Sequence, residues 1–107
     1  MSGSDGPSGT GGQPGGQIVN DCASLQIDDW VQSPESGYPF HDGLVFTLRL
    51  DPDIPPTIAL IDTAGDEVGA VQPRPALIRC LQRGVGFRAI VTDTSGGSIQ
   101  IHVEATS

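Results

Sequence analysis

Residues 56–104 read PTIALIDTAGDEVGAVQPRPALIRCLQRGVGFRAIVTDTSGGSIQIHVE, and they contain most of the aliphatic residues that this chain can bury. Within them, apolar runs at 57–62 and 67–71 flank a polar turn that contains a glycine, and runs at 86–93 and 98–104 flank another. Short apolar runs on either side of such turns are typical of antiparallel strand pairs. The stretch therefore predicts two β-hairpins, separated by residues 72–85.

The segment between the hairpins predicts a short helix. Pro75 suits a first helical turn, where no amide donor is needed, and Gly84 suits the position at which a helix stops. The apolar side of this helix consists of Ala76, Leu77, Cys80 and Leu81. A helix of about two and a half turns is too short to be stable alone, so we expect it to cover the sheet.

The earlier part of the chain predicts two more strands. Apolar residues alternate with polar ones from residue 23 to residue 28, and more strongly from 44 to 50. A period of two indicates a strand with one buried face. Trp30 follows the first run at a break in the pattern, and we expect it to close the core rather than to serve as an exposed stacking platform. Gly69, within a predicted strand, indicates a bulge or the close approach of another backbone.

These patterns together predict a mainly β fold, a small six-stranded barrel of the OB-, SH3- or RIFT-like kind with one short helix. The barrel is expected to occupy residues 18–107, with core positions at Leu48, Leu60, Leu81 and Ile101. Residues 1–17 hold seven of the fifteen glycines and no aliphatic residue after Met1. Such a segment buries nothing that offsets the entropy of ordering it, so a disordered tail is predicted.

The charge of the chain argues against some classes of partner. Thirteen acidic residues oppose five basic ones, which gives a formal charge of -8. General adhesion to nucleic acid or to an anionic membrane depends on positive charge and is disfavoured. The chain has no apolar run of about 18 residues and no secretory signal at its start. We therefore expect a soluble, cytoplasmic protein with no membrane partner.

The two cysteines are too few for a structural zinc site, which requires four Cys or His ligands. His41 and His102 do not complete such a site by their spacing. The leading interpretation of Cys22 and Cys80 is a pair of buried thiols, with a disulfide as the second interpretation and a catalytic or metal-binding role as the remaining one. We expect neither a metal nor a cofactor.

No pattern in the chain predicts catalysis. The nucleophile motif G-x-S-x-G is absent from the sequence, as are the glycine-rich motifs that bind phosphates. His102 lies on the polar side of the last predicted strand, among Gln100 and Glu104, which indicates an exposed strand residue. The sequence therefore predicts a protein that is not an enzyme.

Two groups of residues are candidates for binding. Tyr38, Phe40 and His41 lie in a predicted loop at 33–42, where aromatic side chains either plug the end of a barrel or contact a partner. The second group consists of Arg74, Arg79, Arg83 and Arg88. Arg79 and Arg83 are four residues apart and share a helix face. With an aromatic side chain for base stacking, these arginines would form a local site for nucleic acid; otherwise they are solvated residues that balance the acids.

The second half of the chain resembles HIRAN-type domains. The resemblance rests on the apolar run Ile58-Ala59-Leu60-Ile61, on Gly65, and on Val68-Gly69, followed by Ala76, Leu81, Gly84, Phe87 and Val91. It implies a six-stranded, OB-like barrel that holds the 3′ end of single-stranded DNA, often beside a helicase. Here residues 51–56 replace the Asn-Pro-x-Asp turn of that family, and the first half lacks a basic and aromatic DNA surface.

Most of the chain also resembles small, free-standing bacterial proteins of unknown function. Those proteins join a glycine-rich head to such a barrel, with one cysteine before the first strand and another in the helix. The leading hypothesis is a non-enzymatic, HIRAN-like interaction module, for which a protein is favoured over nucleic acid as the partner. The alternative is a binder of single-stranded DNA ends through a local patch of arginine and aromatic residues.

Overall fold

The strands predicted from residues 44–104 all form, and they belong to one antiparallel sheet. The computed structural model describes residues 22–106, so the predicted disordered tail at residues 1–17 lies outside the described part of the chain. The described elements are, in order, β1 (Gln26–Trp30), β2 (Val45–Asp51), β3 (Thr57–Ile61), β4 (Glu67–Val71), α2 (Pro75–Gln82), β5 (Phe87–Asp93) and β6 (Gln100–Ala105). The predicted mainly β fold with one short helix is confirmed.

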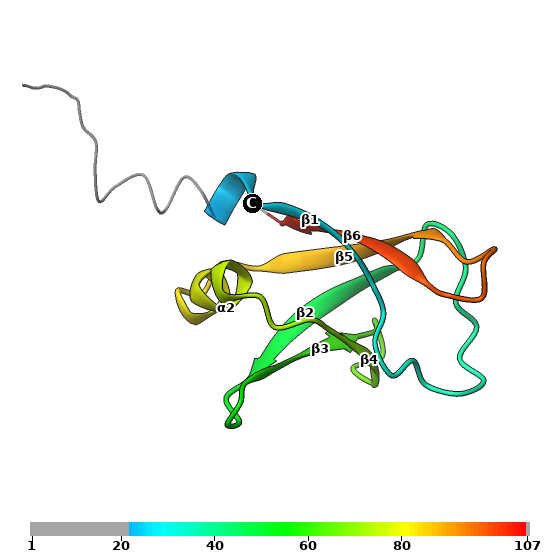
Figure 1. Ribbon diagram of the computed structural model, residues 1–107, viewed down its shortest axis with the longest axis horizontal. Coiled ribbons are helices and arrows are strands. Elements are labelled where there is room, and N and C mark those ends of the chain that lie inside the picture. The colour runs from blue at the N-terminus through cyan, green and yellow to red at the C-terminus, as the bar shows by residue number, and fades with distance from the viewer. Residues whose placement is uncertain (1–21, 107) are drawn as a thin grey trace, which may run out of the picture.

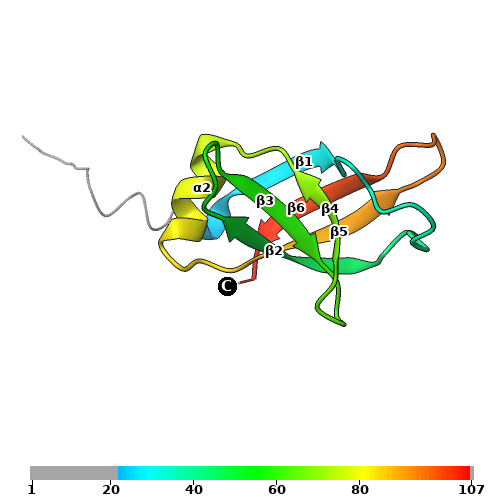
Figure 2. The ribbon, with the colours of Figure 1, turned by 90° about the horizontal axis from the view of Figure 1, so that it is seen from below.

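The sheet curls into a partly open barrel in which the strand order is β1-β6-β5-β2-β3-β4 (Figure 1). Both predicted hairpins are present, because β3 pairs with β4 and β5 pairs with β6. Seen from below, β3 and β4 cross β1 and β6 at an angle (Figure 2). The curl brings the residue after Val31 to β4, where Gln32 and Ala70 exchange backbone hydrogen bonds of 2.7 and 2.9 Å. We call the line along which β1 faces β4 and the start of α2 the seam.

A glycine allows the seam to close. A Cβ atom added at Gly69 would lie 2.5 Å from Val31 Cγ1 and 3.3 Å from the carbonyl oxygen of Gln32. Real Cβ atoms are almost never that close to another heavy atom, so a side chain at this position would push the two edges apart. The predicted close approach at Gly69 is confirmed, and the register of β3 and β4 also shifts between Leu60 and Ile61.

The core lies inside the curl and is formed by alternate residues of the strands. Phe46, Leu60 and Ile101 are among its largest fully buried side chains. Of the four predicted core residues, Leu60 and Ile101 are fully buried, whereas Leu48 and Leu81 are partly buried and pack against the core. Ile58, Ala59 and Leu60 are all buried, as expected for a strand covered on both faces.

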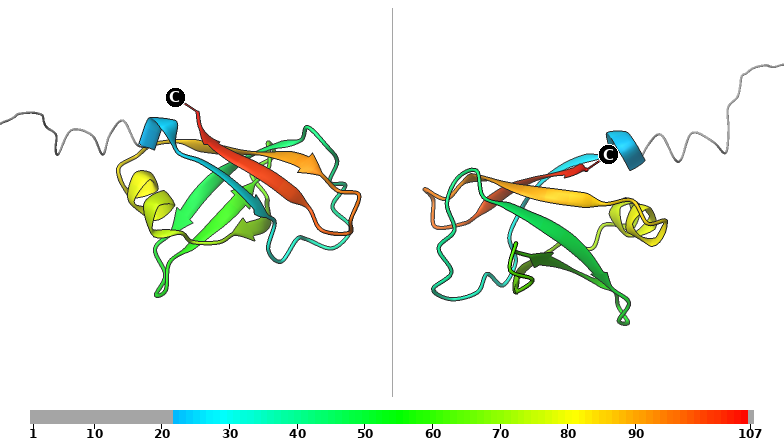
Figure 3. Two further views of the ribbon diagram at one scale, coloured as in Figure 1. Left: turned by 45° about the horizontal axis from the view of Figure 1, so that its top comes forward. Right: turned by 180° about the vertical axis from the view of Figure 1, so that it is seen from behind.

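Helix α2 lies at one end of the barrel, and the turn between β5 and β6 lies at the other (Figure 3). The helix begins at Pro75 with no side-chain cap at its start, and Gly84 follows its end with a φ of 85°. Glycine adopts this left-handed conformation without the cost that a Cβ atom imposes, which explains why the helix stops there. Leu77 and Cys80 are the helix residues that are buried.

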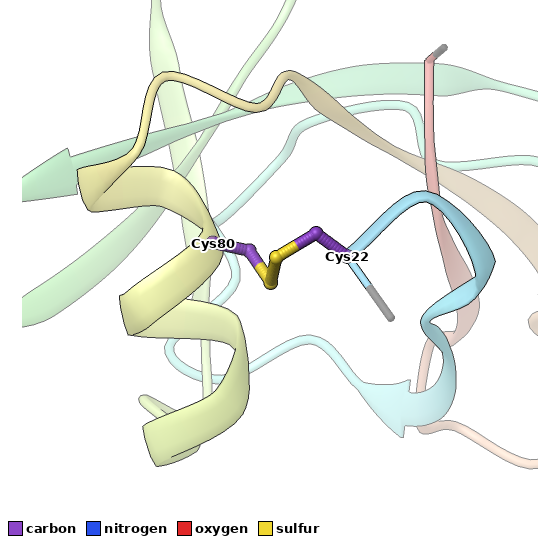
Figure 4. Close-up of a disulfide and its surroundings, with 2 residues drawn as sticks. All are labelled: Cys22 and Cys80. Carbon is purple, nitrogen blue, oxygen red and sulfur yellow. A yellow bond between two sulfur atoms is a disulfide. The ribbon is translucent and has the colours of Figure 1, made fainter. Parts of the chain in front are cut away.

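The leading interpretation of the cysteines as two free thiols is wrong, because Cys22 and Cys80 form a disulfide (Figure 4). Although 58 residues separate them in sequence, the fold places their Cα atoms 5.6 Å apart, within the range typical of disulfides. The bond joins the segment before β1 to α2, and both cysteines are buried. It is therefore a covalent link across the seam.

The start of the first strand also differs from the prediction. Residues 22–24 form a helical turn, and β1 begins only at Gln26. The disulfide at Cys22 and the hydrogen bond from the Leu25 amide to the Cys22 carbonyl, at 3.3 Å, keep this segment out of the sheet. The alternation at residues 23–25 was therefore a poor guide to where the strand begins.

Candidate functional site

Trp30 is exposed on the outer face of the sheet, at the end of β1. Its exposed fraction is 53%, so the expectation that this residue closes the core is wrong. The reason is the alternation along β1 and the residue after it, because Asp29 and Val31 are buried while Asp28 and Trp30 point to solvent. Tyr38, Phe40, Phe46 and Phe87 are all buried or partly buried. Trp30 is therefore the exposed aromatic residue of the chain.

A hollow of about 230 Å³ lies beside Trp30. We call it the Trp30 groove, and its lining residues are Asp28, Asp29, Trp30, Thr92, Gln100 and Ile101. The pairing of the strands explains this set, because Trp30 lies opposite Gln100 and Asp29 lies opposite Ile101 across β1 and β6. Thr92 lies on β5, at the irregularity between Val91 and Asp93 where this strand loses its regular register with β6. The groove thus combines an indole with carboxylate, amide and hydroxyl groups.

Asp29 is the buried charge of this region, with an exposed fraction of 8%. Its Oδ1 accepts a hydrogen bond of 2.8 Å from the Trp30 amide, and its Oδ2 lies 3.3 Å from Arg74 Nη2. Arg74 is the residue just before α2, so this ion pair crosses the seam between β1 and the helix. Arg74 Nε is buried without a hydrogen-bond partner among the described residues. The role of Arg74 in this structure is to join two edges of the barrel.

The outer face beside Trp30 carries a row of side chains joined by polar contacts. His102 Nδ1 lies 2.7 Å from Asp28 Oδ1, and His102 Nε2 lies 3.6 Å from Glu104 Oε1. Arg88 donates from Nε to Glu104 Oε2 at 2.9 Å. His102 therefore stands between two carboxylates, and no serine or cysteine is its partner in these contacts. Such a row stabilises the pairing of β1, β6 and β5 across their outer face.

The predicted arginine group is divided by the structure. Arg74 pairs with Asp29 and Arg88 with Glu104, whereas Arg79 and Arg83 are exposed at the end of α2. Within residues 22–106, neither Arg79 nor Arg83 forms a salt bridge. Two of the four arginines are thus engaged by carboxylates, and the other two are exposed.

The predicted aromatic loop covers the barrel end opposite α2. The ring centroid of Tyr38 lies 4.8 Å from that of Phe40 and 6.0 Å from that of the buried Phe46. The Tyr38 hydroxyl donates to Asp62 Oδ2 at 3.3 Å, and burial together with this carboxylate raises the pKa of Tyr38. His41 is exposed, with Nδ1 lying 3.1 Å from the Asp42 carbonyl oxygen. Tyr38 and Phe40 have the packing of a plug, while His41 lies outside it.

The groove residues Asp28, Thr92 and Gln100 were absent from the candidates that the sequence suggested. The sequence does contain a signal for Asp28. Gln26, Asp28 and Trp30 occupy alternate positions and therefore share one face of a strand, and the pattern predicts that Gln26 faces solvent. Continuing the period of two by one step would have placed Trp30 outside. Thr92 and Gln100 depend on how β5 and β6 pair, which no local pattern shows.

Comparisons with known proteins do not assign the site. No family model, curated protein or solved structure matches this chain. Residues 22–106 contain no group of three or more His, Cys, Asp or Glu side chains placed to hold a metal ion. Nor does any helix in that range have the length and apolar content needed to cross a membrane. The function must therefore be argued from the geometry of the Trp30 groove.

Proposed function

We propose that this protein is a non-enzymatic interaction module that docks a protein partner through the Trp30 groove. The observation that supports this proposal is the exposure of Trp30, at 53%, beside a hollow formed by residues of β1, β5 and β6. Tryptophan is enriched among the residues that contribute most to the affinity of protein interfaces, where it fills or lines pockets at their centre. An exposed indole leaves apolar surface in water that a docked partner would bury.

The contacts of the titratable groups favour binding over catalysis. His102 is held between Asp28 and Glu104, and Asp29 is held by Arg74 and a backbone amide. A general base must be free to reach a reacting proton, and a nucleophile must lie beside its base. These groups instead stabilise the sheet and the seam. The resemblance of the second half of the sequence to HIRAN-type domains also supports an interaction module, because those domains often lie beside a helicase.

The loop containing Tyr38, Phe40 and His41 is a weaker docking surface than the groove. Tyr38 and Phe40 use their rings against Phe46, so displacing them would open the barrel end. The arginine group is also weaker, since binding of nucleic acid by Arg74 or Arg88 would break an existing ion pair. We therefore place the partner at Trp30.

The disulfide favours an oxidising compartment for this module. A cytoplasmic location was expected from the sequence, but structural disulfides persist mainly where thiols are not kept reduced. The bond is buried and joins α2 to the segment before β1. We propose that the domain acts in such a compartment. The test is to isolate the protein under alkylating conditions and to compare its thiol content with that of the Cys22→Ala/Cys80→Ala variant.

A peptide-display selection tests the proposed function. A library of random peptides is selected against the wild-type chain and counter-selected against Trp30→Ala, in which the fold is expected to persist because the indole is outside the core. The expected result is enrichment of peptides that bind only the chain containing Trp30. Enrichment of peptides that bind both chains equally, or no enrichment, would contradict the proposal.

A second assay tests the alternative, a binder of single-stranded DNA ends. Oligonucleotides with a free and with a blocked 3′ end are compared by fluorescence anisotropy on the wild-type chain and on Arg79→Ala/Arg83→Ala. We expect no preference for the free end, because the chain carries a charge of -8 and half of the arginine group is paired. A clear preference that disappears in the double variant would replace the protein partner by nucleic acid.

A further inference from the structure

The Trp30 groove has the size of one side chain. Its volume of about 230 Å³ is below that of the clefts of about 300–1,000 Å³ that bury drug-sized ligands. It is formed by residues of β1, β5 and β6, and the pairing of β1 with β6 fixes the positions of Trp30 and Gln100. A partner segment would therefore place a single side chain in it and lie across the outer face of the sheet.

The charge of the groove is negative. Two of its six lining residues are aspartates, and none is basic. The side chain of Asp28 is 88% exposed, and one of its oxygens, Oδ1, contacts His102. Asp29, in contrast, uses both oxygens, one on the Trp30 amide and one on Arg74. Asp28 is thus the carboxylate that can meet a ligand, whereas Asp29 fixes the shape of the groove.

The indole and the carboxylate complement the same kind of ligand. The face of a tryptophan ring attracts cations more strongly than that of any other side chain, and a guanidinium group also stacks on it. Asp28 lies two residues before Trp30 in β1, and both side chains are on the outer face of the sheet. A cation lying over the indole would therefore have a carboxylate within reach. The net charge of -8 favours the approach of a positive segment from a distance.

We propose that the Trp30 groove receives the positively charged side chain of an arginine or lysine in a basic segment of the partner protein. This inference rests on the proposed function, and it adds the chemistry of the partner to it. Trp30 provides the surface on which the cation stacks, and Asp28 provides the opposite charge. Thr92 and Gln100 line the same groove and offer hydroxyl and amide groups to the backbone or to the remaining N–H donors of the segment.

The test uses two short peptides that differ in one charge. Acetyl-Gly-Arg-Gly-amide and the same peptide with citrulline, a neutral analogue of arginine, are titrated into the isotope-labelled full chain and followed by NMR. The expected result is that the arginine peptide shifts the indole N–H signal of Trp30 and the amide signals of Thr92 and Gln100. The citrulline peptide should bind about tenfold more weakly, because it loses both the cation–π contact and the ion pair.

A pair of charge variants locates the effect. Asp28→Asn should weaken the arginine peptide by about fivefold and leave the citrulline peptide unchanged. Asp53→Asn is the control, because it removes the same charge from an exposed residue that follows the C-terminal end of β2 and does not line the groove. It should leave the affinity for both peptides unchanged. Equal losses in the two variants would mean that only the overall charge matters, which would overturn the assignment of the groove.

Other results would overturn the inference while sparing the proposed function. One such result is equal affinity for the two peptides. Another is a shift of the Trp30 indole signal with the neutral sugar methyl glucoside but not with the arginine peptide. Peptides selected from the display library that need Trp30 but contain no arginine or lysine would have the same meaning. The absence of any Trp30-dependent peptide in that library would instead overturn both.

Discussion

At the scale of single residues, the structure depends on which side of a strand each residue occupies. Asp29 of β1 is buried, and so is Val31, which follows the strand and meets Gly69 at the seam. The outer positions hold Asp28 and Trp30. If β1 were shifted by one residue, its two faces would exchange. The indole of Trp30 would then be buried, and the ion pair between Asp29 and Arg74 would be exposed. The groove is thus a direct consequence of the closed seam.

Gly69→Ala is expected to destabilise the fold by about 1–3 kcal/mol, the usual cost of overpacking a tightly filled position. The new methyl group would lie 2.5 Å from Val31 Cγ1, and the backbone of Gln32 limits its retreat. Urea unfolding of Gly69→Ala, Val31→Ala and the double variant measures this cost. The double variant should lose less than the sum of the single losses, since Val31→Ala removes the clashing atom. Additive losses would show that the contact across the seam does not control this position.

Asp93 is expected to contribute a small pH-dependent stability at the β5–β6 turn. The Ser95 amide and hydroxyl donate to its two oxygens, each at 3.1 Å, and they hold the pKa of Asp93 below its usual range. The folded state therefore gains stability above the ordinary carboxyl pKa of about 3.9 and loses it as the pH falls through the lower folded pKa. Thermal unfolding between pH 2 and about pH 5 should show a weaker pH dependence in Asp93→Asn. An identical slope in the two proteins would rule out this contribution.

At the scale of elements, the barrel is closed by three links of different kinds along the seam. They are the backbone pair Gln32–Ala70, the ion pair Asp29–Arg74 and the disulfide Cys22–Cys80. The links join β1 and its flanking residues to β4 and α2. Regular strand pairing between β1 and β4 is replaced by these separate contacts, so the position of β1, and of Trp30 with it, depends on them.

Removal of the disulfide is expected to cost about 2–5 kcal/mol. For a closed loop of 58 residues, the entropy of the unfolded chain alone accounts for about 4 kcal/mol. Cys22→Ala/Cys80→Ala and the reduced wild-type chain should therefore unfold at a lower urea concentration than the oxidised chain. A loss below about 1 kcal/mol in both would show that the other contacts of the seam suffice to close it.

The elements also show how far sequence patterns predict this fold. The period of two in residues 44–50 predicted the buried face of β2, and the proline and glycine at the ends of α2 predicted its bounds, because both signals are local. The same period at residues 23–25 misplaced the start of β1, since the disulfide formed by Cys22 decides that segment. Pairing of the cysteines and the groove residues Thr92 and Gln100 depend on contacts between distant segments, which local patterns do not contain.

At the scale of the whole molecule, the two ends of the barrel differ from its outer face in the side chains that they carry. Helix α2 covers one end of the barrel, and the turn between β5 and β6 lies at the other end (Figure 3). The disulfide joins α2 to the segment before β1, and Tyr38 and Phe40 pack their rings against Phe46. This packing leaves Tyr38 and Phe40 partly buried. The outer face of β1, β6 and β5 carries Trp30 beside the groove. The proposed contact with a partner is therefore on this outer face, in a chain whose net charge is -8.

The fluorescence of Trp30 reports directly on the proposed docking site, because the chain contains a single tryptophan. The measurement is quenching of Trp30 emission by acrylamide, first in the free protein and then with a saturating concentration of a peptide from the display selection. We predict strong quenching in the free chain, as expected for an exposed fraction of 53%, and clear protection together with a blue shift once the peptide is bound. A buried, weakly quenched indole in the free chain, or quenching that a bound peptide leaves unchanged, would contradict the claim that partners dock on Trp30.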